Sequence, residues 1–199
     1  MESKQLSIFE SFYQQADNVY IAWTIQQGLF NQEQSEILAK SSYYGHFFHK
    51  LNDIIIDYLL LQISKLHDPS KSGTRKNIGI PLILKEVNKN KLLFNSSTNK
   101  IINLGEKLTK FFKKNELIKS FRNKKLSHND LKFLSGNKNL ILFPHGEDIE
   151  YFRNLEKFVE ILSKKTHGEN GFFTFNKLYK NDANAFIHNF INKIINHKS

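Results

Sequence analysis

The chain contains 199 residues, 40% of them hydrophobic, and carries a formal net charge of +10. This length fits one domain, and the hydrophobic content supports a buried core, which argues against a globally disordered chain. The absence of cysteine excludes disulfides and thiolate metal sites. The basic charge favours polyanionic partners, with nucleic acid ahead of an anionic membrane.

No segment predicts a membrane span or a secretory signal. The most apolar run, residues 54–63, contains Asp57 and is too short to cross a bilayer. The first residues lack the apolar core of a signal peptide. We therefore expect a cytoplasmic protein with no membrane partner.

Helical periodicity begins with a predicted helix over about residues 7–28. Aromatic and small residues recur there at the spacing of one buried helix face: Phe9, Phe12, Tyr13, Ala16, Tyr20 and Trp23. A second, longer helix with a wide apolar face is predicted over 34–66. It ends there because Pro69 disfavours its continuation. The loop that follows, residues 70–77, is polar and basic, which is typical of a solvated connection.

Four more helices are predicted in the rest of the chain. A short helix starts near Ile80, with Pro81 in its first turn. The others cover about 98–128, 148–164 and 182–196. Together these patterns predict an all-α fold with little or no sheet.

Two expectations concern the arrangement of these helices. Asn115 marks a point where the 98–128 helix can divide in two. We expect that helix to pack with residues 40–66 as the spine of a single domain that covers residues 1–199.

The most basic stretch of the chain contains Arg122. Between residues 106 and 125 there are seven lysines and this arginine against two glutamates, a local charge of +6. Because the chain prefers lysine so strongly, an arginine is typical of a position that needs a planar, permanently charged group. On a helix Arg122 would share a face with Ile118 and Leu126, so it interrupts an apolar stripe.

His128 lies six residues after Arg122, about 120° further around a straight helix. Spacing alone leaves two readings open. In the structural reading, a partly buried Arg122 pairs with a carboxylate and His128 lies at the negative end of a helix. In the functional reading, the two side chains act together at one site.

Other motifs in the chain do not predict a cofactor or a metal. There is no phosphate-binding glycine loop, no dinucleotide fingerprint and no HExxH sequence. His46, His49 and Asp53 have helical metal-ligand spacing, but no further ligand accompanies them. We therefore expect a solvated or core-edge pair of histidines and no metal site.

Two segments resemble the HEPN superfamily. Arg122-Asn123, with five residues between the arginine and His128, is similar to the short Arg/His signature that this superfamily carries on an α-helical bundle. The segment 66–78 starts with Leu-x-Asp-Pro and resembles the loop after the second long helix in the AbiU-type abortive-infection branch. The ending at Asp130, two residues after the histidine, is also similar to that branch.

The resemblance implies a HEPN-like bundle of long antiparallel helices over about residues 10–165. It leaves residues 166–199 as a C-terminal helical extension packed on that core, within the single domain. It further implies a metal-independent endoribonuclease that needs no cofactor and acts as a homodimer on RNA. Such proteins are often the toxic half of a defence or toxin–antitoxin system, so an antitoxin or another defence-system protein is the implied partner.

The resemblance also assigns roles to residues. His128 would exchange protons with the RNA, Arg122 would stabilise the charge of the transition state, and Asn123 would orient the phosphate or the imidazole. The RNA-binding residues would be Lys119, Lys124, Lys125 and Arg75.

Asp68 and Asp130 would support the site. Some family toxins have a tyrosine where this chain has Asp130, and a partner nucleotidyltransferase modifies it, so the resemblance does not imply that route of control here. Two non-enzymatic readings stay open. One is a HEPN-like RNA-binding or adaptor module in which Arg122 pairs with Asp68 or Asp57. The other is an antitoxin-like helical dimer that binds a protein.

Overall fold

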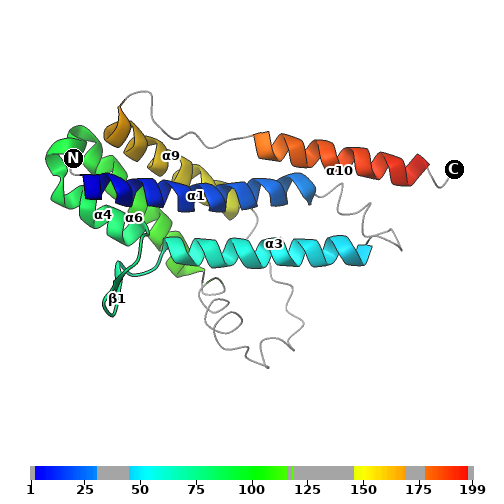
Figure 1. Cartoon of the computed structure of the whole chain (residues 1–199), viewed down its shortest axis with the longest axis horizontal. Coiled ribbons are helices and arrows are strands. Elements are labelled where there is room, and N and C mark those ends of the chain that lie inside the picture. Colours follow the sequence, from blue (N-terminus) through cyan, green and yellow to red (C-terminus); the bar gives the residue numbers. More distant parts are fainter. Residues whose placement is uncertain (1–2, 31–44, 116–117, 119–145, 169–177, 197–199) are drawn as a thin grey trace. The chain divides into compact units, whose positions relative to one another are not determined.

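The structure is a computed structural model, and it describes residues 3–30, 45–115, 118, 146–168 and 178–196 (Figure 1). Helices dominate these residues, which confirms the predicted all-α fold. The helical elements are α1 (Ser3–Leu29), α3 (Gly45–Leu66), α4 (Ile80–Lys89), α5 (Lys91–Phe94), the 3-10 turn η1 (Asn95–Ser97), α6 (Thr98–Lys114), α9 (Glu147–His167) and α10 (Leu178–Asn196).

The chain divides into two compact units, and α1 and α3 each contribute a part to both. The first unit comprises Met1–Asp17 and Leu60–Thr174, and the second comprises Asn18–Leu59 and Phe175–Ser199. The expectation of one domain over the whole chain, with residues 166–199 packed on a core, stays a prediction.

The core of the first unit is largely aromatic where α1 packs. Phe9 of α1 lies against Phe94 at the end of α5, with ring centroids 5.8 Å apart. Phe12 meets Phe158 of α9 edge to face, also at 5.8 Å. All four rings are fully buried, so the aromatic stripe that the sequence predicted on this helix is a core stripe.

Helix α6 completes this unit by packing against α9 and α4. Its buried side carries Ile101, Leu104 and Leu108. The contact with α4 is close at Gly105, where an added Cβ would lie 2.7 Å from a methyl group of Leu84. Among the described residues α6 has its main contacts with α9 and α4, and the expectation that it forms a common spine with residues 40–66 stays a prediction.

The second unit has a separate core around α10. The buried side chains of this cluster come from the end of α1, the start of α3 and α10: Leu29, Phe48, Ala183, Ile187 and Ile191. The aromatic ring of Phe190 lies 5.2 Å from that of Phe48 and extends the cluster. Ile187 and Ile191 of the apolar pattern predicted for the last helix are buried, whereas Phe186 is 58% exposed.

Helix α6 ends where the sequence allowed a break. Its last residue is Lys114, and Asn115 follows in a non-helical conformation with φ −91° and ψ 78°. The side-chain amide of Asn115 donates to the carbonyl oxygen of Phe111 at 3.2 Å, a bond that competes with helix continuation. The predicted remainder of this helix, 119–128, lies outside the described residues, as do residues 34–44 of the predicted second helix.

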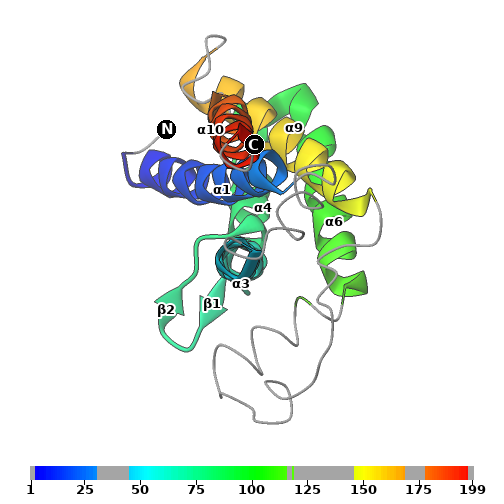
Figure 2. The same cartoon turned by 90° about the vertical axis from the view of Figure 1, so that its right-hand side faces the viewer.

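A small hairpin replaces the solvated loop predicted over residues 70–77. Strands β1 (Lys71–Ser72) and β2 (Arg75–Lys76) pair antiparallel (Figure 2). All four residues are exposed. Gly73 at the turn has a φ of +60°, which a glycine adopts without strain. In the part of the chain that the structure describes, no helix combines the length and the apolar character that a membrane span requires.

Candidate functional site

The loop after α3, one of the two segments that carry the HEPN resemblance, is held by hydrogen bonds to backbone carbonyl groups. The helix closes with the amide of Asp68 donating to the carbonyl of Lys65 at 3.2 Å. Asn77 then ties the far end of the hairpin to its start, since its side-chain amide donates to the carbonyl of Pro69 at 2.9 Å. Its backbone amide donates to the carbonyl of Ser70 at 3.2 Å.

Gly79 explains how the chain turns back from this hairpin into α4. It packs so closely on the end of α3 that an added Cβ would lie 2.7 Å from the carbonyl oxygen of Leu66. Its φ of −165° is ordinary extended backbone, so glycine is needed here for space and not for conformation. Pro81 follows in the first turn of α4, as predicted.

His67 is the residue of this loop that reaches into the core. Its Nε2 lies 3.0 Å from the hydroxyl of Tyr151 on α9, and its ring stacks on Phe112 of α6 at 4.4 Å. Burial lowers the pKa of His67 to about 3 and raises the pKa of Tyr151. The imidazole is therefore neutral at physiological pH. Its Nδ1 is buried without a hydrogen-bond partner among the described residues.

An ion pair joins the two helices that border the Arg/His segment. Lys114, the last residue of α6, lies with its Nζ 2.9 Å from the Oε1 of Glu147, the first residue of α9. The hydrogen bond from Lys114 lowers the pKa of Glu147, and the same contact raises the pKa of Lys114. The end of α6 and the start of α9, which flank residues 115–146, therefore lie side by side.

Two of the site residues predicted from the sequence lie in the described part of the chain, and the others lie outside it. Arg75 is exposed on β2, and Asp68 is half-buried directly after α3. The remaining predicted residues lie outside the described residues: Arg122, Asn123, His128, Lys119, Lys124, Lys125 and Asp130. The structure brings together the surroundings of the two resembling segments, because His67 of the first contacts the helix that leads to the second.

Ile118 is the described residue that precedes the predicted site most closely in the sequence. Its side chain is buried, with 1% of its surface exposed, and its amide donates to the carbonyl of Asn115 at 3.1 Å. Arg122 comes four residues later. The chain is therefore anchored in the core of the first unit within four residues of the predicted catalytic arginine.

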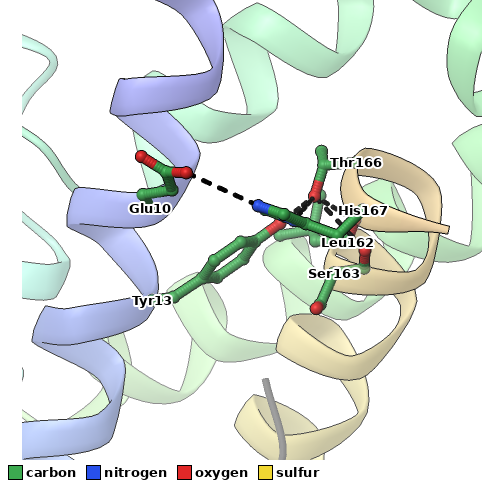
Figure 3. A network of polar contacts seen from close by, with 6 residues as sticks. All are labelled: Glu10, Tyr13, Leu162, Ser163, Thr166 and His167. Carbon is green, nitrogen blue, oxygen red and sulfur yellow. Dashed lines mark hydrogen bonds and ion pairs between the residues drawn. The ribbon is translucent and has the colours of Figure 1, made fainter. Parts of the chain in front are cut away.

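A second polar network, which the sequence did not predict, joins α1 to the last turn of α9 (Figure 3). The hydroxyl of Tyr13 lies 2.8 Å from that of Thr166, which in turn lies 2.8 Å from Nδ1 of His167. Nε2 of His167 faces a carboxylate oxygen of Glu10 at 3.6 Å. Burial raises the pKa of Tyr13, so its hydroxyl stays protonated and the network acts as a tie between the helices.

No metal-binding cluster of three or more His, Cys, Asp or Glu side chains occurs within the described ranges. His46 and His49, whose spacing resembled that of metal ligands, are both exposed on α3, and Asp53 is half-buried on the same helix. The arrangement matches the solvated pair expected from the sequence.

Comparison with known proteins decides the family. The family model HEPN_AbiU2, described as AbiU2, matches residues 4–186. The chain belongs to the HEPN AbiU2 family. The match begins in α1 and extends into α10, so AbiU2 similarity continues past residue 165, where the resemblance seen in the sequence stopped. No curated protein and no solved structure matches the chain.

Proposed function

We propose that this AbiU2 protein is a metal-independent endoribonuclease that acts in a defence or toxin–antitoxin system. The observation that carries the proposal is the family match over residues 4–186 in a chain that has Arg122 and His128 at the HEPN spacing. The formal net charge of +10 suits an RNA substrate. A protein partner such as an antitoxin belongs to the same proposal.

The proposed reaction uses the 2′-hydroxyl of the RNA as the nucleophile. His128 takes the proton of this hydroxyl, whose oxygen attacks the adjacent phosphorus. Arg122 stabilises the negative charge on the phosphate oxygens in the transition state, and Asn123 orients the phosphate or the imidazole. The bond to the 5′-oxygen then breaks, and this oxygen receives a proton. The products are a 2′,3′-cyclic phosphate and a free 5′-hydroxyl.

The surroundings of the segment support this proposal. The Lys114–Glu147 ion pair and the buried Ile118 restrain the chain on either side of it, and restrained supports favour precise catalytic geometry. Lys119, Lys124 and Lys125 would attract the RNA backbone.

Arg75 of the exposed hairpin would add a contact to the RNA backbone, and Asp68 lies between α3 and this hairpin. With Asp130 beside His128, Asp68 would support the site. These two carboxylates are proposed as positioning residues rather than as groups that touch the substrate.

A homodimer is part of the proposal. The separation of Arg122 and His128 by about 120° on a straight helix makes it difficult for one protomer to direct both at a single phosphate. Two copies related by a two-fold axis would supply both groups to one groove and would concentrate the basic charge there.

The direct test uses a single-stranded RNA and a DNA of the same sequence, each incubated with purified protein in excess EDTA. The proposal predicts that the RNA is cut and that the DNA survives, because DNA lacks the attacking hydroxyl. Binding of RNA without cleavage would favour a catalytically silent RNA-binding module. If neither binding nor cleavage occurs, a protein-interaction module is favoured.

A further inference from the structure

Helix α6 carries a line of lysines along the side opposite to its buried residues. Lys107 lies seven positions after Lys100, and Lys114 lies seven positions after Lys107. Seven residues bring a helix back to nearly the same face, about 10 Å further along its axis. Lys110 lies beside this line, about 60° from Lys107. Lys100, Lys107 and Lys110 are all exposed, and we call these three residues the α6 lysine stripe.

The stripe has one acidic residue on its own helix and no ion-pair partner among the described residues. Glu106 is the one acidic residue of α6. Lys114, at the end of the line, pairs with Glu147, whereas no ion pair joins the three lysines of the stripe to any carboxylate in the described part of the chain. These charges are therefore available to an external anion.

The direction of the stripe connects it with the proposed site. It runs along α6 toward Lys114, where the chain leaves the helix for the segment that contains Arg122 and His128. Helix α6 packs on α9 and α4 (Figure 2), so the stripe lies on a helix that two others support. A series of exposed cations on a rigid helix suits a flexible polyanion that extends over several nucleotides.

We infer that the α6 lysine stripe binds the phosphate backbone of single-stranded RNA on one side of the cleavage site. This inference rests on the proposed function, since it names the path by which that substrate reaches Arg122 and His128. The contacts are with phosphates and carry no base recognition, so they contribute affinity and not sequence preference.

The test measures binding separately from cleavage. A single-stranded RNA with 2′-O-methyl groups has no attacking hydroxyl, so its affinity can be measured without hydrolysis. The variant Lys100→Gln/Lys107→Gln/Lys110→Gln is compared with a control, Lys50→Gln/Lys157→Gln/Lys193→Gln, which neutralises three exposed lysines on other helices. Both triple variants have the same net charge, and circular dichroism checks that both remain helical.

The readout is the slope of log affinity against log salt concentration. Removing three phosphate contacts to a single strand should reduce the magnitude of this slope by about 2 in the stripe variant. The control should keep a slope close to that of the wild type. Equal slopes in the stripe variant and the wild type would overturn the inference. So would an unchanged RNA slope together with lost binding to phosphatidylserine vesicles, because the stripe would then bind a membrane surface.

The two proposals can fail independently. If the wild type does not cut unmodified RNA but the slope falls as expected, the stripe binds RNA and the ribonuclease proposal is wrong. If the wild type cuts RNA and the slope is unchanged, the ribonuclease proposal stands and the stripe is not the path of the substrate.

Discussion

The imidazole of His67 lies flat on the ring of Phe112, with centroids 4.4 Å apart and planes 5° from parallel. His67 directly follows α3 and Phe112 belongs to the last turn of α6. The same imidazole reaches the hydroxyl of Tyr151 on α9. A single neutral histidine therefore connects the three helices that border the proposed site.

The first prediction is a loss of stability in acid that depends on His67. Burial lowers the pKa of this residue from 6.5 to about 3, so between these values the unfolded chain binds a proton that the folded chain does not. Its contribution to stability is complete above pH 6.5 and declines by about 1.4 kcal/mol per pH unit below it. His67→Gln should flatten the dependence of the unfolding free energy on pH in this window.

Chemical denaturation at several pH values measures that slope. The matched control is His46→Gln, which changes an exposed histidine and should leave the slope as it is in the wild type. If the unfolding free energy of the wild type, His67→Gln and His46→Gln depends on pH with the same slope, His67 is not held neutral by burial.

The second prediction concerns the ion pair between Lys114 and Glu147. Each single charge reversal, Lys114→Glu or Glu147→Lys, should slow RNA cleavage, because the ends of the Arg/His segment then repel each other. The effect can reach about 10²-fold if the catalytic groups move by an ångström. The thermal midpoint should change little, since exposed ion pairs contribute little to stability. Cleavage should recover in the double reversal, and an equally slow double variant would contradict the positioning role.

The third prediction compares the loss of stability caused by alanine at two closely packed positions, Gly79 and Gly105. Gly79→Ala places a Cβ against the backbone carbonyl of Leu66, which cannot move independently, so the variant should lose about 1 to 3 kcal/mol of unfolding free energy. At Gly105 the neighbour is the end of the flexible Leu84 side chain. Alanine also favours a helix by about 1 kcal/mol over glycine, so Gly105→Ala should cost much less. Urea unfolding of both variants tests the order.

The fourth prediction follows from the proposed dimer. Arg122→Ala and His128→Ala proteins should each be inactive alone. If the arginine and the histidine of one site come from different protomers, mixed dimers contain one intact pair. Random mixing of equal amounts should then restore about a quarter of the wild-type rate. Light scattering at micromolar concentration checks the dimer itself. An inactive mixture of dimeric variants would place both groups of a site in the same protomer.

Periodicity and breaker residues predicted much of the fold. Pro81 marked the start of α4 correctly, and Asn115 marked the end of α6, because both act on the backbone of their own helix. The packing of α6 on α9 and α4 could not be predicted this way. The apolar face of α6 is equally suited to any neighbouring helix, and the selection of its partners depends on long-range contacts such as that of Gly105 with Leu84.

The surroundings of the candidate site could not be predicted from local sequence patterns. His67 precedes Asp68 and Pro69, which made it look like part of an exposed loop, yet a single further turn places it in the core. Lys114 and Glu147 are 33 positions apart, and no local pattern pairs them. The hypothesis for Arg122 and His128 came from a resemblance, and the family match supports that resemblance without testing the two residues.

The most direct measurement of the central claim is the rate of RNA cleavage in EDTA by the wild type, His128→Ala and Arg122→Lys, with analysis of the product ends. We expect the wild type to leave a 2′,3′-cyclic phosphate, and His128→Ala to be slower by roughly 10² to 10⁴ with its helical content preserved. Arg122→Lys should also be impaired, since a point charge does not replace the planar fork. Unchanged cleavage by folded His128→Ala would contradict the account.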